Sequence, residues 1–378
     1  MSIPTNIFEP SLYEPVRRAV LEARHLPPWC YTTDAFYQRE VASIFLKDWN
    51  FLGREDRLPN PGDYFTVNFA GVPLFVIRNG VGELRAYANT CSHRGSKLLE
   101  DEGHCRSVIQ CPYHAWAYDF DGALVATPGM ERAEEFDPAE LGLRGIKLEA
   151  WDGFVFINFD PDSRNLSEYL GTLPEKLQSY NFTDMVTVRR KEYDLACNWK
   201  LFIENAMEEY HTATVHKASV GKQRLEYEEG NGEWDAAFLA SDKSIAILPK
   251  ERAEFPHIES LDERTRGGTY FVHVKPATML GCTQDCMWWL EQHPIGPART
   301  KLTVGACFPK STVERPNFDE VVQKYYHRWD KSIPEDNWIS EVQQVGLTSP
   351  FSRTSRISHN EILVHKIANW VLDRVLDG

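Results

Sequence analysis

The chain has 378 residues, of which 42% are hydrophobic and 25% are charged, so we expect a folded protein of one large domain or two to three ordinary ones. Its formal net charge of −14 argues against nucleic acid as the main partner, because phosphate binding needs a basic surface. The start of the chain lacks a basic, apolar leader, and no stretch has the ~18 uninterrupted apolar residues of a membrane-spanning helix. We therefore expect a cytoplasmic protein that binds neither nucleic acid nor a membrane.

The first half of the chain combines a short helical region with a block of strands. Residues 10–24 (PSLYEPVRRAVLEAR) predict a helix that ends before the prolines of HLPPW. From about residue 51 the pattern changes to short strands separated by turns, and Asn79-Gly80 and Asp121-Gly122 each lie between two such strands. This block predicts a compact β-domain that ends near Asp160.

The second half predicts helices before and after a second set of strands. Helical stretches near residues 166–180 and 197–213 precede β-rich segments between residues 266 and 309. Two further helices, at about 317–346 and 360–376, close the chain. The last has apolar residues at helical spacing, which favours a core-facing helix over one that lies on a membrane surface.

Two short motifs of the β-domain carry potential metal ligands. CSHRG contains Cys91 and His93, and CPYHAW contains Cys111 and His114. Two thiolates and two imidazoles on two loops make a four-ligand metal site. A structural zinc ion fits, and so does a two-iron, two-sulfur cluster with both cysteines on one iron and both histidines on the other. The surrounding hairpins and aromatic residues favour the cluster.

A second group of polar residues lies in NAMEEYHTATVH, at positions 205–216. On a helical wheel that begins at residue 199, apolar residues form one stripe, and Glu204, Glu208 and His211 fall on the opposite side. Such a face would ordinarily meet water. Here it carries carboxylates and an imidazole but no lysine or arginine after Lys200, and His216 would reach the same point if the helix ended or widened near residue 212.

Two histidines need one carboxylate to complete the facial triad of a non-haem ferrous site, which leaves positions open for dioxygen and substrate. Glu208, one turn before His211, is the local candidate. The alternative is an acid from the C-terminal stretch PEDNWISEVQQ, in which Glu335, Asp336 and Glu341 cluster. The residues alone leave this choice open.

Together the two motifs resemble those of the α-subunit of Rieske non-haem iron oxygenases, and the resemblance covers nearly the whole chain in the family's order. It implies an α+β fold, with a Rieske [2Fe-2S] domain over residues 41–160 and a catalytic domain over 161–378, whose antiparallel sheet is wrapped by helices. Residues 1–40 would form a helical segment that packs on the catalytic domain. The family's usual assembly is a homotrimer in which electrons pass between the metals of neighbouring chains.

The resemblance also implies a role for each residue of the motifs. Cys91, His93, Cys111 and His114 would hold the [2Fe-2S] cluster. The mononuclear Fe(II) would be held by His211, His216 and Asp336, of which Asp336 is identified by its five-residue lead over Glu341.

Glu208 and Asn205 are the catalytic residues that the resemblance implies beside the iron. Glu208 matches an acid that bridges to a Rieske histidine of the neighbouring chain, and Asn205 matches an amide of the family pattern. Most ring-hydroxylating members have Asp at the first position and one more residue before the histidine. The Glu and the shorter spacing resemble the carnitine, choline and betaine monooxygenases and N-dealkylating relatives.

The implied protein is the terminal oxygenase component of a multicomponent monooxygenase. It would use O2 and electrons from NAD(P)H to hydroxylate a carbon next to nitrogen, which leads to N-dealkylation, N-demethylation or C–N cleavage of a small amine or amide. The chain has no flavin or nicotinamide motif, so a separate flavin reductase, with or without a ferredoxin, is expected to deliver the electrons.

Other activities stay open. Aromatic ring hydroxylation or O-demethylation, as in aromatic compound catabolism, would use the same metals, whereas a Rieske-type electron carrier would need only the first motif. Four aromatic residues could line a pocket or cage a quaternary ammonium group, although core packing is the simpler role for each: Tyr270, Phe271, Trp288 and Trp289.

Overall fold

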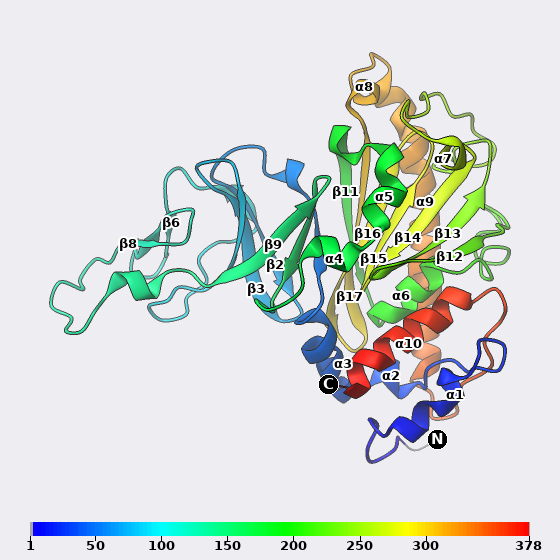
Figure 1. The fold of residues 1–378 in the computed structure, drawn as a ribbon, viewed down its shortest axis with the longest axis horizontal. Helices are drawn as coiled ribbons and strands as arrows, with labels where there is room; N and C mark the ends of the chain where they lie inside the picture. Colours follow the sequence, from blue (N-terminus) through cyan, green and yellow to red (C-terminus); the bar gives the residue numbers. More distant parts are fainter. Residues whose placement is uncertain (1–2, 378) are drawn as a thin grey trace. The chain divides into compact units, whose positions relative to one another are not determined.

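The computed structural model describes residues 3–377, and these form two compact units. One unit runs from Lys47 to Ser163, and the other combines the chain up to Leu46 with the part from Arg164 onward. Figure 1 shows the elements of both units in sequence colours. The N-terminal segment thus belongs to the same unit as the C-terminal half, and the predicted α+β fold is confirmed.

The unit from Lys47 to Ser163 is built from strands. A seven-stranded antiparallel sheet has the order β1-β10-β9-β4-β3-β2-β5, and a small sheet has the order β6-β7-β8. The strands are β1 Asn50–Arg54, β2 Asp63–Phe69, β3 Val72–Arg78, β4 Leu84–Ala88, β5 Glu102–His104, β6 Ile109–Gln110, β7 Ala117–Tyr118, β8 Leu124–Ala126, β9 Gly145–Trp151 and β10 Phe154–Asn158. Both predicted hairpins are confirmed, because β3 pairs with β4 and β7 pairs with β8.

The larger unit contains a second seven-stranded antiparallel sheet, of order β11-β17-β16-β15-β14-β13-β12. Its strands are β11 Met185–Leu195, β12 Glu226–Glu229, β13 Trp234–Ala240, β14 Gly268–Val274, β15 Thr278–Cys282, β16 Met287–Gly296 and β17 Arg299–Pro309. Every residue of β14 and β15 is buried, which is the pattern of strands covered on both faces.

Helices surround this second sheet. They are α1 Glu14–Arg17, α2 Trp29–Thr32, α3 Asp34–Glu40, α4 Leu166–Leu170, α5 Leu173–Leu177, α6 Trp199–Ala206, α7 Glu263–Arg266, α8 Lys310–Val313, α9 Phe318–Leu347 and α10 Ile362–Asp377. The short α6 packs against the long α9 and against β15 and β16, so residues on α6 and α9 are brought together beside the middle of the sheet. None of the helices in the described range is both long and apolar enough to cross a bilayer.

Two predicted helices are shorter than expected. The helix expected over residues 10–24 stops at Arg17, because Arg18 is extended. Beyond it, Arg24 forms an isolated antiparallel bridge with Arg356, a tertiary pairing that outweighs local helix preference. The helix expected over residues 197–213 ends at Ala206.

A buried ion pair joins the N-terminal segment to α6. Lys200 Nζ lies 2.6 Å from Glu40 Oε1, and both side chains are fully buried. One turn further on, Glu204 accepts a hydrogen bond of 2.9 Å from the hydroxyl of Tyr31. Burial raises the pKa of Glu204 to about 8. Glu204 therefore faces the N-terminal segment and does not belong to the polar face expected from the helical wheel.

Replacing Lys200 with Met is expected to lower the free energy of unfolding by about 3–5 kcal/mol, because it leaves the Glu40 carboxylate buried without its partner. The matched control is the double variant Lys200→Met with Glu40→Leu, which removes both charges and should recover most of the loss. Denaturant unfolding followed by tryptophan fluorescence measures both. A loss of under about 1 kcal/mol in the single variant would mean that the pair contributes little.

Candidate metal centres

Polar side chains set both the start and the end of α6. The Asn198 side chain caps the start of the helix by accepting a hydrogen bond from the Lys200 N–H. After Ala206, the Glu208 carboxylate accepts hydrogen bonds from the backbone N–H groups of Tyr210 and His211. Such local bonds compete with helical hydrogen bonding. Turns follow instead of helix, and the Tyr210 side chain is 61% exposed.

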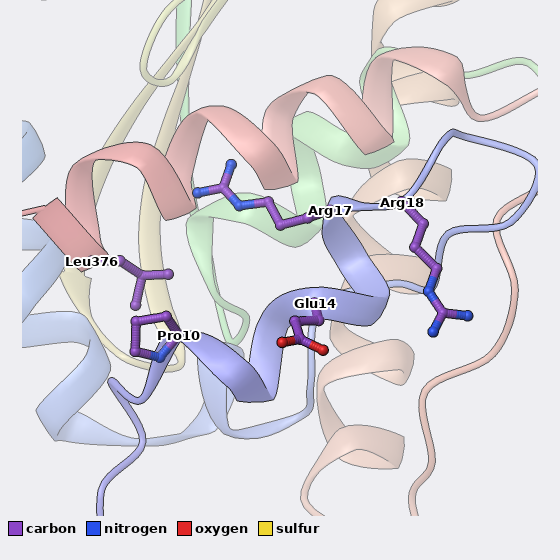
Figure 2. A pocket seen from close by; sticks show the side chains of 5 residues that line it. All are labelled: Pro10, Glu14, Arg17, Arg18 and Leu376. Atoms are coloured by element: carbon purple, nitrogen blue, oxygen red, sulfur yellow. The ribbon is translucent and has the colours of Figure 1, made fainter.

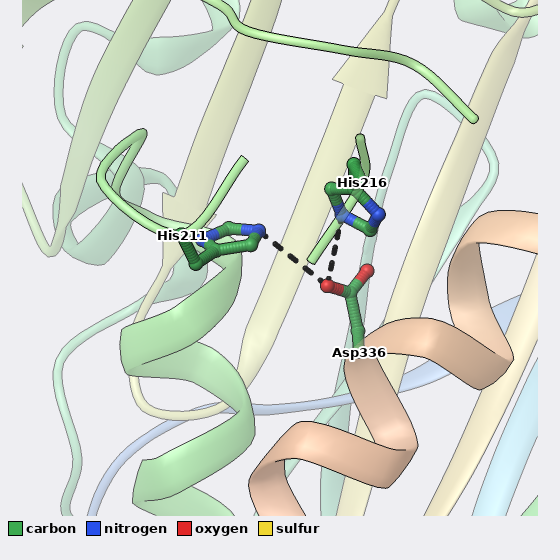
Figure 3. Close-up of side chains that lie close together, drawn as sticks. All are labelled: His211, His216 and Asp336. Atoms are coloured by element: carbon green, nitrogen blue, oxygen red, sulfur yellow. Dashed lines mark ion pairs between the residues drawn. The ribbon is translucent and has the colours of Figure 1, made fainter. Parts of the chain in front are cut away.

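These turns bring His211 and His216 to Asp336 on α9 (Figure 3). Asp336 Oδ1 lies 3.5 Å from His211 Nε2 and 3.0 Å from His216 Nε2. One ligand atom from each residue lies within 4.8 Å of the other two. Asn205, on the last turn of α6, donates a hydrogen bond of 2.8 Å from Nδ2 to Asp336 Oδ1. Two imidazoles and a carboxylate that converge in this way fit a non-haem ferrous ion.

Each of the two imidazoles turns Nε2 towards the cluster and holds a carboxylate at Nδ1. His211 Nδ1 lies 2.6 Å from Glu208 Oε1, and His216 Nδ1 lies 2.7 Å from Glu335 Oε2. The hydroxyl of Ser219 donates to the same oxygen of Glu335. Carboxylates in this position fix the ring orientation and the tautomer, so that Nε2 is left to bind a metal.

The charges of the cluster stabilise one another. Burial lowers the pKa of His211, but hydrogen bonds to Asp336 and Glu208 outweigh this effect and raise it to about 9. Burial raises the pKa of Asp336, but hydrogen bonds from His211 and His216 hold it well below its usual range. The carboxylate of Asp336 is therefore ionised, as a metal ligand must be, and a metal that binds His211 displaces the proton from Nε2.

The acids that the sequence left open as third ligand occupy different positions. Asp336 is the one that faces both Nε2 atoms, and Glu208 lies on the outer side of His211. Glu341 lies away from the cluster and accepts a hydrogen bond from the backbone N–H of Ala196. The role of Glu335 was missed, because only the folded chain shows that it meets His216.

Replacing Glu335 with Gln is expected to weaken the binding of ferrous ion about 10–100-fold, because His216 loses the charged partner that orients it. The measurement is an anaerobic titration of the metal-free site with ferrous ion. Glu341→Gln is the matched control, since it changes an acid on the same helix that touches neither imidazole. An affinity equal to that of the parent in Glu335→Gln would show that the carboxylate does not support the ligand.

A cavity of about 60 Å³ lies beside the cluster. Its apolar wall comes from alternate positions of three neighbouring strands: Phe271 on β14, Met279 on β15, and Trp288 and Leu290 on β16. A Cβ on Gly281 would lie 2.4 Å from the Trp288 ring, so this glycine makes room for the indole. Two of the four aromatic residues named from the sequence thus line the cavity. Of the other two, Tyr270 donates a hydrogen bond from its hydroxyl to Glu228, and Trp289 packs over Gly305.

The Cys-His motifs of the smaller unit form two loops with the same backbone arrangement. In each, the cysteine N–H donates to the carbonyl five residues further on, and the fourth residue donates back to the cysteine carbonyl. That fourth residue has a positive φ, 71° at Gly95 and 58° at Ala115. An alanine adopts this conformation at a cost that the surrounding structure must offset. Contacts around the second loop therefore stabilise its backbone conformation.

The side chains of these loops fit an iron–sulfur cluster. Cys91 and Cys111 are buried, and the rings of His93 and His114 meet edge to face with centroids 4.7 Å apart. His114 Nδ1 is buried without a hydrogen-bond partner in the described range, which is costly unless a metal binds it. Burial raises the pKa of Cys111, but backbone N–H groups of Tyr113 and His114 outweigh this effect and lower it, which favours a thiolate ligand.

A surface depression of about 330 Å³ between α1 and α10 has no histidine or cysteine among its lining residues (Figure 2). It is lined by Pro10, Glu14, Arg17, Arg18 and Leu376. Arg17 reaches from it to α10 and lies 2.5 Å from the Asp373 carboxylate. The depression shares no lining residue with the cavity at the histidines.

Comparisons with protein families divide the chain as the two metal motifs do. Residues 48–137 match the Rieske [2Fe-2S] domain, and residues 182–377 match the catalytic domain of the ring hydroxylating alpha subunit. The first match decides between the two metals considered for the Cys-His motifs in favour of the [2Fe-2S] cluster.

Individual relatives match over most of their length. Choline monooxygenase, chloroplastic, of Spinacia oleracea is 29% identical over 364 residues, which cover 93% of this chain and 78% of that protein. The carnitine monooxygenase oxygenase subunit of Escherichia coli (strain K12) is 29% identical over 336 residues, with 87% and 85% covered. The solved structure of a quaternary ammonium Rieske monooxygenase, described with carnitine oxidation and inter-subunit electron transfer, superposes with a TM-score of 0.79 at 25% identity over 93% of this chain and 95% of that one.

Proposed function

The chain belongs to the α-subunits of Rieske non-haem iron oxygenases, and on this premise we propose that it oxidises a carbon next to nitrogen in a small amine. The chain is a monooxygenase of this family, and its substrate is the part that is proposed. The observation that carries the proposal is the Glu208 to His211 spacing, in a chain similar over most of its length to choline and carnitine monooxygenases. Ring hydroxylation or O-demethylation is the alternative at the same cavity.

We assign the metals to the residues that the two motifs predict. The cluster would be held by Cys91, His93, Cys111 and His114, and the mononuclear iron by His211, His216 and Asp336. When bound, the cluster supplies single electrons and the iron supplies activation of dioxygen. The chain's own part is to orient the ligands, hold the substrate and exclude water.

The proposed reaction consumes one O2, two electrons and two protons for each substrate molecule. One oxygen atom of O2 is inserted into a C–H bond of an N-methyl group, and the other leaves as water. The carbinolamine that results breaks its C–N bond, so that the methyl carbon leaves as formaldehyde and the hydroxyl proton passes to the amine or to solvent. The apolar wall of Phe271, Met279 and Trp288 would keep bulk water from this carbon.

Glu208 is the residue to which we assign the passage of electrons into the site. On its own chain it binds His211 Nδ1. We propose that it also meets a cluster histidine of a neighbouring chain, in a homotrimer that receives electrons from NAD(P)H through a flavin reductase, with or without a ferredoxin. The relative described with inter-subunit electron transfer supports this arrangement.

A single-turnover experiment tests the proposed reaction. The iron-loaded, chemically reduced protein is mixed with O2 and a panel of amines with isotopically labelled N-methyl groups. Labelled formaldehyde and the matching demethylated amine are the expected products. Turnover of methoxybenzoates or arenes, with no release from any N-methyl compound, would replace the proposal with its alternative.

A further inference from the structure

Arg328 is a buried cation in the wall of the metal cavity. It lies on α9, on the same face as Ser332 and Asp336, at positions i, i+4 and i+8. It lines the cavity and is only 6% exposed. Buried guanidinium groups are almost always paired with a carboxylate or held by several hydrogen bonds.

The pairing of Arg328 is incomplete. Nη1 donates a hydrogen bond of 3.0 Å to Ser332 Oγ, and the guanidinium carbon lies 4.9 Å from the centre of the Trp288 ring. Nε is buried without a partner, and no ion pair to Arg328 is formed within residues 3–377. Nε and Nη2 form one edge of the guanidinium plane, and it is the edge that takes both oxygens of a carboxylate.

At the end of the metal cavity where Arg328 lies, few side chains could bind a cationic group. The Arg328 guanidinium already lies over the Trp288 ring, which a quaternary ammonium group would otherwise use. The cavity's carboxylates, Glu208 and Asp336, are bound to the imidazoles. Burial lowers the pKa of Arg328 to about 10, so the side chain stays charged near neutral pH. An anion is the group that complements this end of the cavity.

A second, larger cavity adjoins the metal cavity. It has a volume of about 1060 Å³ and shares Val220, Gln223 and Leu225 with the metal cavity. Four basic residues line it, and none of them forms an ion pair in the described part of the chain: Lys222, Arg224, Lys243 and Arg252. Of its three acids, Glu226 pairs with Arg264 and Glu251 with His327. In a chain of net charge −14, this cavity would attract anions.

We propose that Arg328 binds a carboxylate of the substrate, and that the enzyme thereby selects amines that carry an acidic group over amines with an uncharged tail. The proposal rests on the proposed function, in which the N-alkyl group of the substrate would lie towards His211 and His216. Arg328 and Asp336 are eight residues apart on α9, which corresponds to a rise of about 12 Å. The carboxylate and the oxidised carbon would therefore be separated by a spacer of several bonds.

The test compares two probes on the iron-loaded protein without oxygen, with dissociation constants from calorimetry. The probes are N,N-dimethyl-γ-aminobutyrate and the amino alcohol in which CH2OH replaces its carboxylate. The parent is expected to bind the acid at least about tenfold more tightly, as charge-assisted hydrogen bonds at a buried site imply. Arg328→Gln should remove this preference and leave binding of the alcohol within about twofold, whereas Arg328→Lys should keep part of it.

Ser332→Ala is the matched control, because it removes the protein partner of the guanidinium and keeps the charge. It should retain the preference for the acid. In the parent, kcat/KM for the acid should also fall relative to that for the alcohol as ionic strength rises, because salt screens both the attraction of the basic residues for the carboxylate and their repulsion of the cationic alcohol.

Equal binding of the two probes by the parent, binding of neither, or equal loss of both in Arg328→Gln would overturn the proposal. If Arg328 served only to balance the carboxylates of the metal site, Arg328→Gln would lose iron and the remaining loaded protein would keep its preference. Carboxylate preference without formaldehyde release would overturn the proposed reaction alone. Equal formaldehyde release from both probes would overturn the role of Arg328 alone.

Discussion

In protein supplied with excess ferrous ion, so that the mononuclear site stays filled, replacing Glu208 with Gln is expected to lower turnover about a hundredfold or more. The amide keeps nearly the same shape and can still accept a hydrogen bond from His211 Nδ1, which lies 2.6 Å from the carboxylate. It loses the negative charge, and it cannot accept hydrogen bonds from two imidazoles at both of its terminal atoms. The measurements are metal and sulfide content, and the rate at which the reduced cluster is reoxidised with substrate and O2 present.

Glu209→Gln serves as the control for this variant, since Glu209 accepts a hydrogen bond from the backbone N–H of Leu225 and the amide oxygen can replace it. It should turn over within a few-fold of the parent. A Glu208→Gln variant that reoxidises its cluster as fast as the parent would show that electrons do not pass through this residue.

Replacing Asp336 with Ala is expected to abolish turnover by removing the mononuclear iron. It deletes the carboxylate that faces both Nε2 atoms, and two neutral imidazoles bind ferrous ion much more weakly than two imidazoles with a carboxylate. Iron per chain should fall by about one while acid-labile sulfide stays the same, because the [2Fe-2S] ligands lie in the other compact unit.

Asn205→Ala is the milder comparison for Asp336→Ala. It removes only the hydrogen bond to Asp336 Oδ1, so it should weaken iron binding and keep the site. Unchanged iron content in Asp336→Ala would mean that another acid completes the ligand set. Glu335, which touches His216, would then be the first acid to replace.

Much of the fold could be predicted because its signals are local. Asn79-Gly80 and Asp121-Gly122 turns predicted both hairpins, and apolar periodicity predicted α10. The two metal motifs were equally local, since each places its residues within a short stretch of sequence. Spacing of this kind is readable without any knowledge of the fold.

The errors arose where individual side-chain contacts override helical periodicity. α6 ends at Ala206 although helical periodicity continues, and the Glu208 carboxylate binds the following backbone N–H groups. Glu204 sits in the polar half of the wheel but meets Tyr31, 173 residues away. Arg328 appears in the sequence as one more charge on a helix, and only the folded chain shows that it is buried at the cavity.

Metal analysis of protein purified without oxygen tests most directly whether this chain carries both centres. One [2Fe-2S] cluster and one mononuclear ferrous ion predict about three irons and two acid-labile sulfides per chain. Two irons and two sulfides that rise to three irons when ferrous ion is added would fit a catalytic site emptied during handling. Two irons that do not rise, or zinc without sulfide, would contradict the assignment of His211, His216 and Asp336 as an iron site.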